Sequence, residues 1–344
     1  MRRTHLAILG TVLACGLSTA SADEPASDAP RAVSLMHYIH ATQNVDTTTE
    51  FYRDVFGLET PPVRFYDGPG AARLNNAPDL VLRLSRPTLP GEKYGFEFTE
   101  FTHVDRKGGQ QALPTDPGAV ELILHVRDID PVYAAAQKRG AEILSRSGGP
   151  VKIETSMGPA RALLIRDPDG YLVRTIEVPA SKAVLSGNIQ AGTSLGVAVK
   201  DLDETVKFYK EVLGFEVTGD VSFANNPAMA DLVGAPSSSR YRSASATFPG
   251  ESNARIEFYE WKGMPRTPLH LNVPDPGAGG MVMGVKNLDA IVATVKAQGL
   301  PTVTPTPIWF TSTIRDIFVQ DPNGLNLELY EQVPEGEANG SEDD

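Results

Sequence analysis

The sequence predicts an α+β protein built from four βαβββ units in tandem. Three observations support this prediction. The second half of the chain repeats the motifs of the first, each half contains one strand–turn–helix pattern twice, and the strands alternate apolar and polar residues. A chain of 344 residues with 41% hydrophobic content is long enough for two globular modules of this kind.

The duplication is visible in three blocks that recur in the same order at nearly constant spacing. The recurring pairs are residues 44–59 and 201–216, 116–119 and 275–278, and 167–170 and 321–324. The first pair shares a Phe-Tyr step followed by a Gly, and the last pair shares an Asp-Pro-x-Gly turn. These repeats predict two homologous modules, at residues 33–179 and 191–332.

Each module repeats a strand–turn–helix pattern internally. Residues 121–126 alternate in character, with Leu122 on one face and Glu121 and His125 on the other. An acidic turn then precedes a helix with apolar residues at helical spacing, which ends at Gly140. Short strands complete each unit. The same pattern opens the other three units, at residues 37–57, 194–214 and 281–299.

The first 22 residues have the features of a secretory signal peptide. Two arginines follow the first Met, residues 6–17 are almost entirely apolar, and an Ala-Ser-Ala site predicts cleavage after Ala22. We therefore expect a secreted or periplasmic protein whose mature form has no cysteine. The surroundings of Cys15 loosely fit a lipoprotein box, so a lipid anchor is an alternative.

The remaining segments and the charge restrict the partners. We expect a flexible N-terminus at 23–32, a linker at 180–190 and an acidic disordered tail at 333–344. The net charge is −12, with 31 Lys and Arg against 43 Asp and Glu, and this balance argues against a nucleic-acid partner. After residue 22 the chain has no apolar run long enough to span a membrane. A monomer or a homodimer is expected.

The repeated blocks resemble the vicinal-oxygen-chelate superfamily. The resemblance lies in the Asn44 and Asp201 helix starts, the Phe-Tyr and Gly positions after them, and the two Asp-Pro-x-Gly turns. This superfamily includes glyoxalase I, extradiol dioxygenases, methylmalonyl-CoA epimerase and the bleomycin- and fosfomycin-resistance proteins. The resemblance implies that two βαβββ units form a half-barrel, so that the chain holds two half-barrel modules. Up to four side chains in such a cleft hold a divalent metal.

The resemblance also implies which positions would hold a metal. In module one the four positions are His37, Glu97, Glu121 and Arg174; in module two they are Ser194, Glu257, Gly280 and Glu328. We expect one divalent metal in module one, on His37, Glu97 and Glu121, with Glu97 and Glu121 also available to move a proton. Arg174 would place a positive charge beside that metal and lower its affinity. Module two offers two carboxylates without an imidazole, which suits at best a weakly held Mg²⁺ or Ca²⁺.

Further side chains are expected to bind a ligand or to stabilise the fold. The predicted ligand-binding residues are Arg174, His125, Glu257, Tyr259, Trp261 and Glu328. His40 falls on the helix-packing face of its strand and is interpreted as structural. The Asp-Pro-x-Gly segments are interpreted as turns.

Three functions are compatible with these residues. The first is a glyoxalase- or epimerase-like lyase or isomerase in module one, acting on a small molecule. The second is a metal-free small-molecule-binding protein of the resistance type, and the third is a structural role for a duplicate that has lost its site. Extradiol dioxygenases use two His and one carboxylate, which neither module supplies, so ring cleavage is disfavoured. Export argues against glutathione and CoA substrates, which are cytosolic.

Overall fold

The computed structural model describes residues 29–108, 111–249 and 251–334. The predicted signal peptide lies outside these residues, as do most of the predicted flexible N-terminus and most of the acidic tail. Within the described residues, no helix has both the length and the apolar character needed to cross a membrane.

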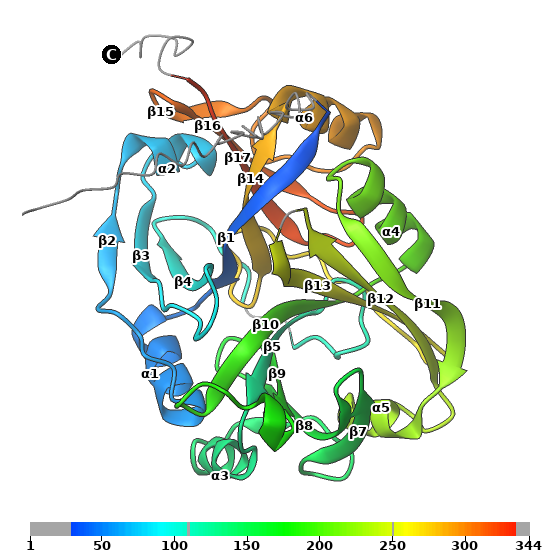
Figure 1. The fold of residues 1–344 in the computed structure, drawn as a ribbon. Helices are drawn as coiled ribbons and strands as arrows, with labels where there is room; N and C mark the ends of the chain where they lie inside the picture. Colours follow the sequence, from blue (N-terminus) through cyan, green and yellow to red (C-terminus); the bar gives the residue numbers. More distant parts are fainter. Residues whose placement is uncertain (1–28, 109–110, 250, 335–344) are drawn as a thin grey trace, which may run out of the picture.

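The four predicted βαβββ units are present, and Figure 1 shows them in chain order from blue to red. Unit one comprises β1 (Arg31–Ala41), α1 (Val45–Phe56), β2 (Arg64–Tyr66), α2 (Pro69–Leu74), β3 (Val81–Ser85) and β4 (Gly95–Thr102). Unit two comprises β5 (Val120–Val126), α3 (Asp130–Lys138), β6 (Glu142–Ile143), β7 (Val151–Thr155), β8 (Gly158–Arg166) and β9 (Leu172–Glu177), and a short 3₁₀ turn, η1 (Ala180–Lys182), follows it. Unit three comprises β10 (Ile189–Ala198), α4 (Leu202–Glu211), β11 (Glu216–Asn225), α5 (Pro227–Leu232), β12 (Arg240–Phe248) and β13 (Glu251–Lys262). Unit four comprises β14 (Gly279–Lys286), α6 (Leu288–Ala297), β15 (Ile308–Thr311), β16 (Ile314–Gln320) and β17 (Asn326–Gln332).

The units pair across the two repeats. An eight-stranded sheet has the order β15-β16-β17-β14-β1-β4-β3-β2 and therefore joins units one and four. A nine-stranded sheet has the order β11-β12-β13-β10-β5-β9-β8-β6, with β7 beside β8, and joins units two and three. The antiparallel pairs β1–β14 and β10–β5 are the seams between units. Each half-barrel thus contains one unit from each repeat. A single repeat of the sequence therefore does not form a half-barrel by itself.

The main helices form where the sequence provides caps and an apolar face. The Asn44 side chain accepts a hydrogen bond from the Thr47 N–H at 3.0 Å, which caps α1, and Asp201 caps α4 in the same way. Gly57 ends α1 with φ of 71°, a conformation that costs a side-chain-bearing residue more than glycine. The buried face of α1 includes Phe51 and Tyr52, which join the largest apolar core.

That core lies against the helices and draws on both sheets. It includes Tyr38 and Phe96 from the eight-stranded sheet and Leu122, Val173 and Leu195 from the nine-stranded sheet. Because one face of each sheet is buried in this core, the opposite, concave faces carry the side chains that can line a cleft.

Candidate functional site

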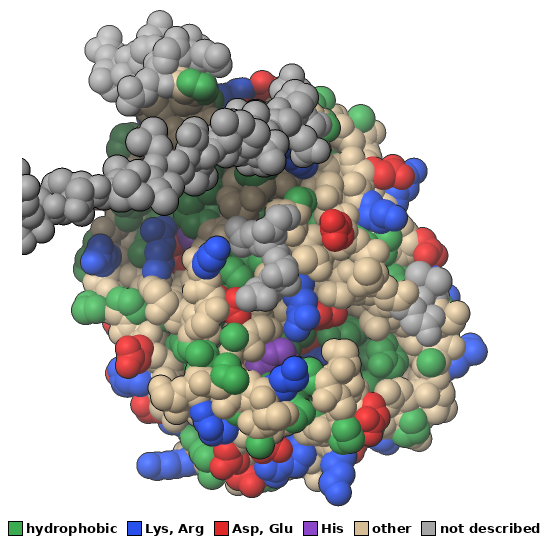
Figure 2. Space-filling view, in the orientation of Figure 1, with side chains coloured by type: hydrophobic (Ala, Val, Ile, Leu, Met, Phe, Trp, Pro, Cys, Tyr) green, Lys and Arg blue, Asp and Glu red, His purple; other side chains and the backbone are tan. Residues whose placement is uncertain are grey.

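A cavity of about 450 Å³ lies on the concave face of the eight-stranded sheet. This volume is within the range of small-molecule pockets. Figure 2 shows hydrophobic side chains lining a recess beside α2. The polar residues of the cavity include His37 from β1, Glu97 from β4 and Glu328 from β17. Its apolar wall includes Phe101, Phe310 and Phe318.

His37 and Glu97 form the polar centre of this cavity. The His37 Nε2 atom lies 3.4 Å from Glu97 Oε2, and the Thr99 hydroxyl donates a hydrogen bond to Glu97 Oε1 at 2.6 Å. Arg86, whose side chain is 58% exposed, also pairs with Glu97. Burial opposes ionisation of Glu97, but the adjacent His37 and Arg86 outweigh it and hold the pKa of Glu97 below its ordinary value. Burial lowers the pKa of His37, although the neighbouring Glu97 charge acts to raise it.

At neutral pH the site therefore holds an ionised carboxylate beside a neutral imidazole. A neutral imidazole and a carboxylate are the forms in which these side chains bind metal ions.

A pair of carboxyl groups in unit four lies at the cavity, which Glu328 lines. The Glu328 side chain hydrogen-bonds the side chain of Asp316 on β16. Burial, followed by the nearby Asp316 and Glu97 charges, raises the pKa of Glu328 well above its ordinary value. Burial raises the pKa of Asp316 to about 7. This pair holds a proton close to neutral pH, which is the condition for a group that donates or accepts protons.

The third ligand position of this half-barrel is Gly280, on β14. A Cβ built there would lie 2.4 Å from the backbone oxygen of Asn326 on β17, so the strand approach leaves no room for a side chain. The eight-stranded sheet therefore brings together ligand-type side chains at three of the four positions, His37, Glu97 and Glu328.

The structure does not bring Glu121 to this site. Glu121 lies on β5 of the nine-stranded sheet, whereas His37 and Glu97 lie on the eight-stranded sheet. The expected set of His37, Glu97 and Glu121 assumed that one repeat forms one cleft. Because the units pair across repeats, Glu328 occupies the place expected for a ligand from the partner unit.

Glu121 instead forms a buried ion pair with Arg174. The Glu121 Oε1 and Arg174 Nη2 atoms are 2.7 Å apart, with side-chain exposures of 7% and 5%. The Arg174 guanidinium also lies 4.9 Å from the ring centroid of Tyr259 and donates to its hydroxyl at 3.3 Å. A guanidinium is permanently charged, so it fills this position of the nine-stranded sheet with a cation of the protein itself.

The other predicted ligand-binding residues of the nine-stranded sheet are held by neighbouring groups. Trp261 is 1% exposed and stacks on Tyr241 in an apolar cluster with Met229 and Leu232, so the structure places it in a core. The Glu257 carboxylate accepts a hydrogen bond from the Ser245 hydroxyl at 3.2 Å.

His125 is likewise enclosed. Its Nδ1 atom lies 3.2 Å from the Ala191 carbonyl oxygen, and a Cβ at Gly192 would lie 2.5 Å from that nitrogen. These contacts favour a packing role for His125 over contact with a ligand.

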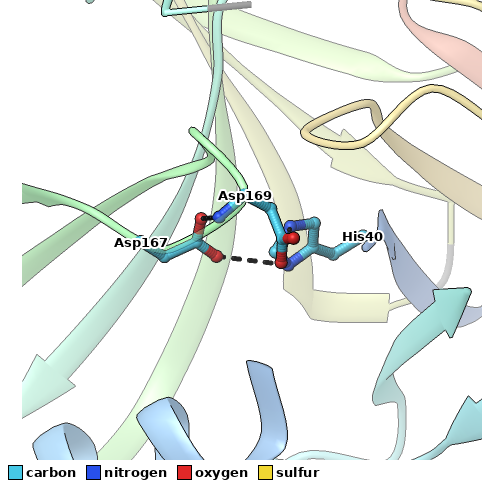
Figure 3. A group of neighbouring side chains, drawn as sticks. All are labelled: His40, Asp167 and Asp169. Atoms are coloured by element: carbon cyan, nitrogen blue, oxygen red, sulfur yellow. Dashed lines mark hydrogen bonds and ion pairs between the residues drawn. The ribbon is translucent and has the colours of Figure 1, made fainter. Parts of the chain in front are cut away.

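A third polar cluster lies on the opposite face of β1, away from the cavity. His40 is fully buried, as expected for the helix-packing face, and its ring stacks on Tyr171 with centroids 4.3 Å apart. Figure 3 shows His40 facing Asp167 and Asp169, the two acids of the Asp-Pro-Asp-Gly turn between β8 and β9. Burial lowers the pKa of His40 to about 3. The turn was expected, but its use as a pair of buried carboxylates was not.

The family of the chain follows from comparison with known proteins. The family model described as the Glyoxalase/Bleomycin resistance protein/Dioxygenase superfamily matches residues 34–175 and 193–329. The two matches cover most of the chain and fall on the two repeats. The chain belongs to this superfamily.

Individual relatives are more distant. Lactoylglutathione lyase GLX1 of Arabidopsis thaliana is 22% identical over 191 residues, which are 53% of this chain. The match spans only 55% of the length of that relative.

Among solved structures, glyoxalase I from Zea mays has a TM-score of 0.55 at 17% identity, covering 88% of this chain and 92% of that one. A putative dioxygenase from Bacillus subtilis has a TM-score of 0.50 at 13% identity, covering 89% and 87%. These similarities show the fold.

Proposed function

We propose that this protein is a metal-assisted lyase or isomerase that acts on a small carbonyl compound in the cavity of the eight-stranded sheet. One observation carries the proposal: a neutral imidazole, an ionised carboxylate and Glu328, whose carboxyl group is paired with that of Asp316, line one cavity of about 450 Å³. The similarity to lactoylglutathione lyase GLX1 supports this reaction class. A fold alone hosts many reactions, so the argument depends on the site.

The side chains of the cavity suit a divalent metal. One imidazole with two carboxylates is a donor set that Zn²⁺, Mn²⁺, Fe²⁺ and Ni²⁺ accept. Burial, followed by the charges of Asp316 and Glu97, raises the pKa of Glu328, and a bound cation would favour its ionised form. His37, Glu97 and Glu328 would hold the ion. When bound, such an ion polarises a carbonyl oxygen and thereby acidifies the adjacent carbon.

The protein's own groups would move the proton. Glu328, with Asp316 beside it, can take a proton from a substrate carbon at a carboxylate oxygen and return it to the neighbouring carbon. Because burial raises the pKa of Asp316 to about 7, a proton can be taken up or released at this pair near neutral pH. Glu97, held ionised by His37 and Arg86, is the better candidate for a permanent charge at the site.

The walls indicate the shape of the substrate. Phe101 and Phe318 are buried beside the polar centre, and Arg64 and Arg86 also line the cavity. We propose a substrate with a compact apolar body and a carbonyl or carboxylate head. We also propose export of the mature chain, on the basis of the predicted signal peptide.

A metal-free binding protein is the second candidate function. Arg86 already pairs with Glu97, so the cavity carries a cation without any metal. Such a cavity could hold an anionic ligand on Arg86 and His37.

Metal content separates the two functions. Protein purified without a His tag is loaded with Ni²⁺, Zn²⁺, Mn²⁺ or Fe²⁺, and bound metal is measured by elemental mass spectrometry for wild type and His37→Ala. We expect His37→Ala to remove one equivalent while circular dichroism shows an intact fold. Ser194→Ala, at the corresponding position of the other sheet, is the matched control and should keep the full metal load.

Activity is then screened with 2-oxoaldehydes and epimerisable 2-substituted acids. If His37→Ala keeps all of its metal, or if no metal binds under any loading, the lyase or isomerase proposal is wrong and ligand screening for a binding protein replaces it.

A further inference from the structure

The third polar cluster, His40 of unit one with Asp167 and Asp169 of unit two, lies between the two sheets. His40 is on β1 of the eight-stranded sheet, and both acids are on the turn between β8 and β9 of the nine-stranded sheet. All three side chains are buried, with exposures of 0% for His40 and Asp167 and 3% for Asp169. The cluster is thus closed to the substrate cavity and to solvent.

The imidazole of His40 has no hydrogen-bond partner on either ring nitrogen. Its Nδ1 atom lies 3.5 Å from Asp167 Oδ2, and its Nε2 atom lies 3.6 Å from Asp169 Oδ2. Both distances exceed those of ordinary hydrogen bonds. A buried polar atom without a hydrogen-bond partner destabilises the fold, so a group that binds a ring nitrogen of His40 would be stabilising.

The two carboxylates are fixed from the other side. Tyr52 donates to Asp167 Oδ2 at 3.2 Å, and Thr48 donates to Asp169 Oδ2 at 2.5 Å. The backbone N–H of Gln43 donates to Asp169 Oδ1 at 2.7 Å. These contacts hold the acids in place and aim both Oδ2 atoms at the ring (Figure 3).

The corresponding cluster of the second repeat provides an internal comparison. Tyr209 donates to Asp321 at 3.2 Å, and the Lys200 N–H donates to Asn323 Oδ1 at 3.0 Å, in the same way as their counterparts in the first repeat. Asn323 stands where the first repeat has Asp169, and Val197 stands where it has His40. The Asn323 amide donates to Thr205 and to Asp321. The polar groups of this copy therefore bond to one another, with Asp321 as the one acidic side chain.

The first repeat therefore carries an additional carboxylate and an imidazole together, at positions that face each other. We propose that His40, Asp167 and Asp169 bind a divalent transition-metal ion that ties the two sheets together. One ligand atom from each residue lies within 4.8 Å of the other two. Two ligands of a tetrahedral Zn²⁺ are about 3.4 Å apart, given bonds of about 2.0–2.1 Å. Each acid lies at a similar distance from a different ring nitrogen, so one ring nitrogen would bind the ion and the acid that faces the other nitrogen would move toward it.

The donor set and the location define the kind of ion. One imidazole nitrogen and two carboxylate oxygens suit Zn²⁺, Mn²⁺ or Fe²⁺ better than Ca²⁺, which prefers six to eight oxygens. Because no substrate can reach a fully buried ion, its role is structural. This inference does not depend on the function proposed for the cavity.

The test replaces the cluster by the residues of the second repeat. In the His40→Val/Asp169→Asn variant, every new side chain is one that the protein already uses at the corresponding place. Wild type and variant are loaded with Zn²⁺ or Mn²⁺, passed through a desalting column, and measured by elemental mass spectrometry and thermal unfolding with and without EDTA.

We expect wild type to hold one more equivalent than this variant and to lose melting temperature in EDTA, while the variant shows no EDTA effect. His37→Ala, which changes only the cavity, should keep both the extra equivalent and the EDTA effect. Equal metal content in wild type and in the His40→Val/Asp169→Asn variant overturns the inference.

A second measurement decides the question if the variant does not fold. Crystals of Zn²⁺-loaded wild type are measured on both sides of the zinc absorption edge. An anomalous peak between His40 and the two acids supports the inference, and its absence from crystals of the loaded protein overturns it.

Discussion

The two clefts have the same architecture and opposite chemistry. In the eight-stranded sheet the family positions carry His37, Glu97 and Glu328 around a cavity. In the nine-stranded sheet the corresponding positions carry an ion pair, Glu121 with Arg174, beside a core that includes Trp261. The comparison teaches that the half-barrel itself does not require a functional centre, because a guanidinium can neutralise the same carboxylates and turn a site into a structural contact.

The largest expected effect concerns the stability that the Glu121–Arg174 pair gives the nine-stranded sheet. Arg174→Met removes one partner of a buried pair and leaves Glu121, whose pKa burial already raises, without its cation. We expect a loss of about 3–5 kcal/mol in the free energy of unfolding. Urea denaturation measures it. The Glu121→Gln/Arg174→Met double variant, which removes both charges, should recover most of the loss, and failure to recover would show that packing against Tyr259 is the main contribution.

Metal binding should distinguish the two sheets next. Glu97 and Glu257 hold corresponding positions, on β4 and β13. Glu97→Gln is expected to lower the affinity of the cavity for Zn²⁺ or Mn²⁺ by at least roughly 10–100-fold, since even the loss of a supporting group costs that much. Isothermal titration calorimetry gives both constants. Glu257→Gln is the control, and an equal loss in the two variants would contradict a site confined to the eight-stranded sheet.

The Glu328–Asp316 pair of the eight-stranded sheet predicts a pH dependence of the stability of the protein. Because burial raises the folded pKa of Asp316 to about 7, the folded state binds this proton more tightly than the unfolded state does. The resulting stability is full below the unfolded pKa of about 4 and is lost as pH rises toward 7, by up to about 1.4 kcal/mol per pH unit.

Comparison with Asp316→Asn isolates this contribution. Wild type should lose more stability than the variant between pH 4.5 and 7, as measured by urea denaturation of metal-free protein at each pH. Parallel curves for the two proteins would mean that the pair does not share a proton near neutral pH.

The sequence allowed the fold to be predicted down to the βαβββ unit because the unit is local. The apolar alternation of β5 and the caps of α1 at Asn44 and Gly57 act over a few residues. The pairing of units is not local, because the seam between β1 and β14 joins strands about 250 residues apart. The residues of each strand do not indicate which strand it pairs with.

This is why half of the site was predictable. His37 and Glu97 belong to the same unit. Their proximity therefore does not depend on which other unit joins the sheet. Glu121 was expected at this site but lies in the other sheet, and Glu328, which the partner unit supplies, lines the cavity instead. The first repeat has His40 and Asp169 where the second has Val197 and Asn323, and this difference is visible in the sequence. That His40 and Asp169 face each other is not visible there, because they lie in different units.

The smallest expected effect on stability concerns Arg86, the exposed cation that pairs with Glu97 in the cavity. Its side chain is 58% exposed, so Arg86→Met should change the free energy of unfolding by no more than about 1 kcal/mol, in contrast to Arg174→Met. The same substitution frees a Glu97 oxygen and removes a positive charge from the cavity. We therefore expect metal affinity to rise severalfold as stability stays nearly constant. Calorimetric titration of both proteins with Zn²⁺ measures the change, and a weaker affinity in Arg86→Met would mean that the guanidinium orients Glu97 for the ion instead of competing with it.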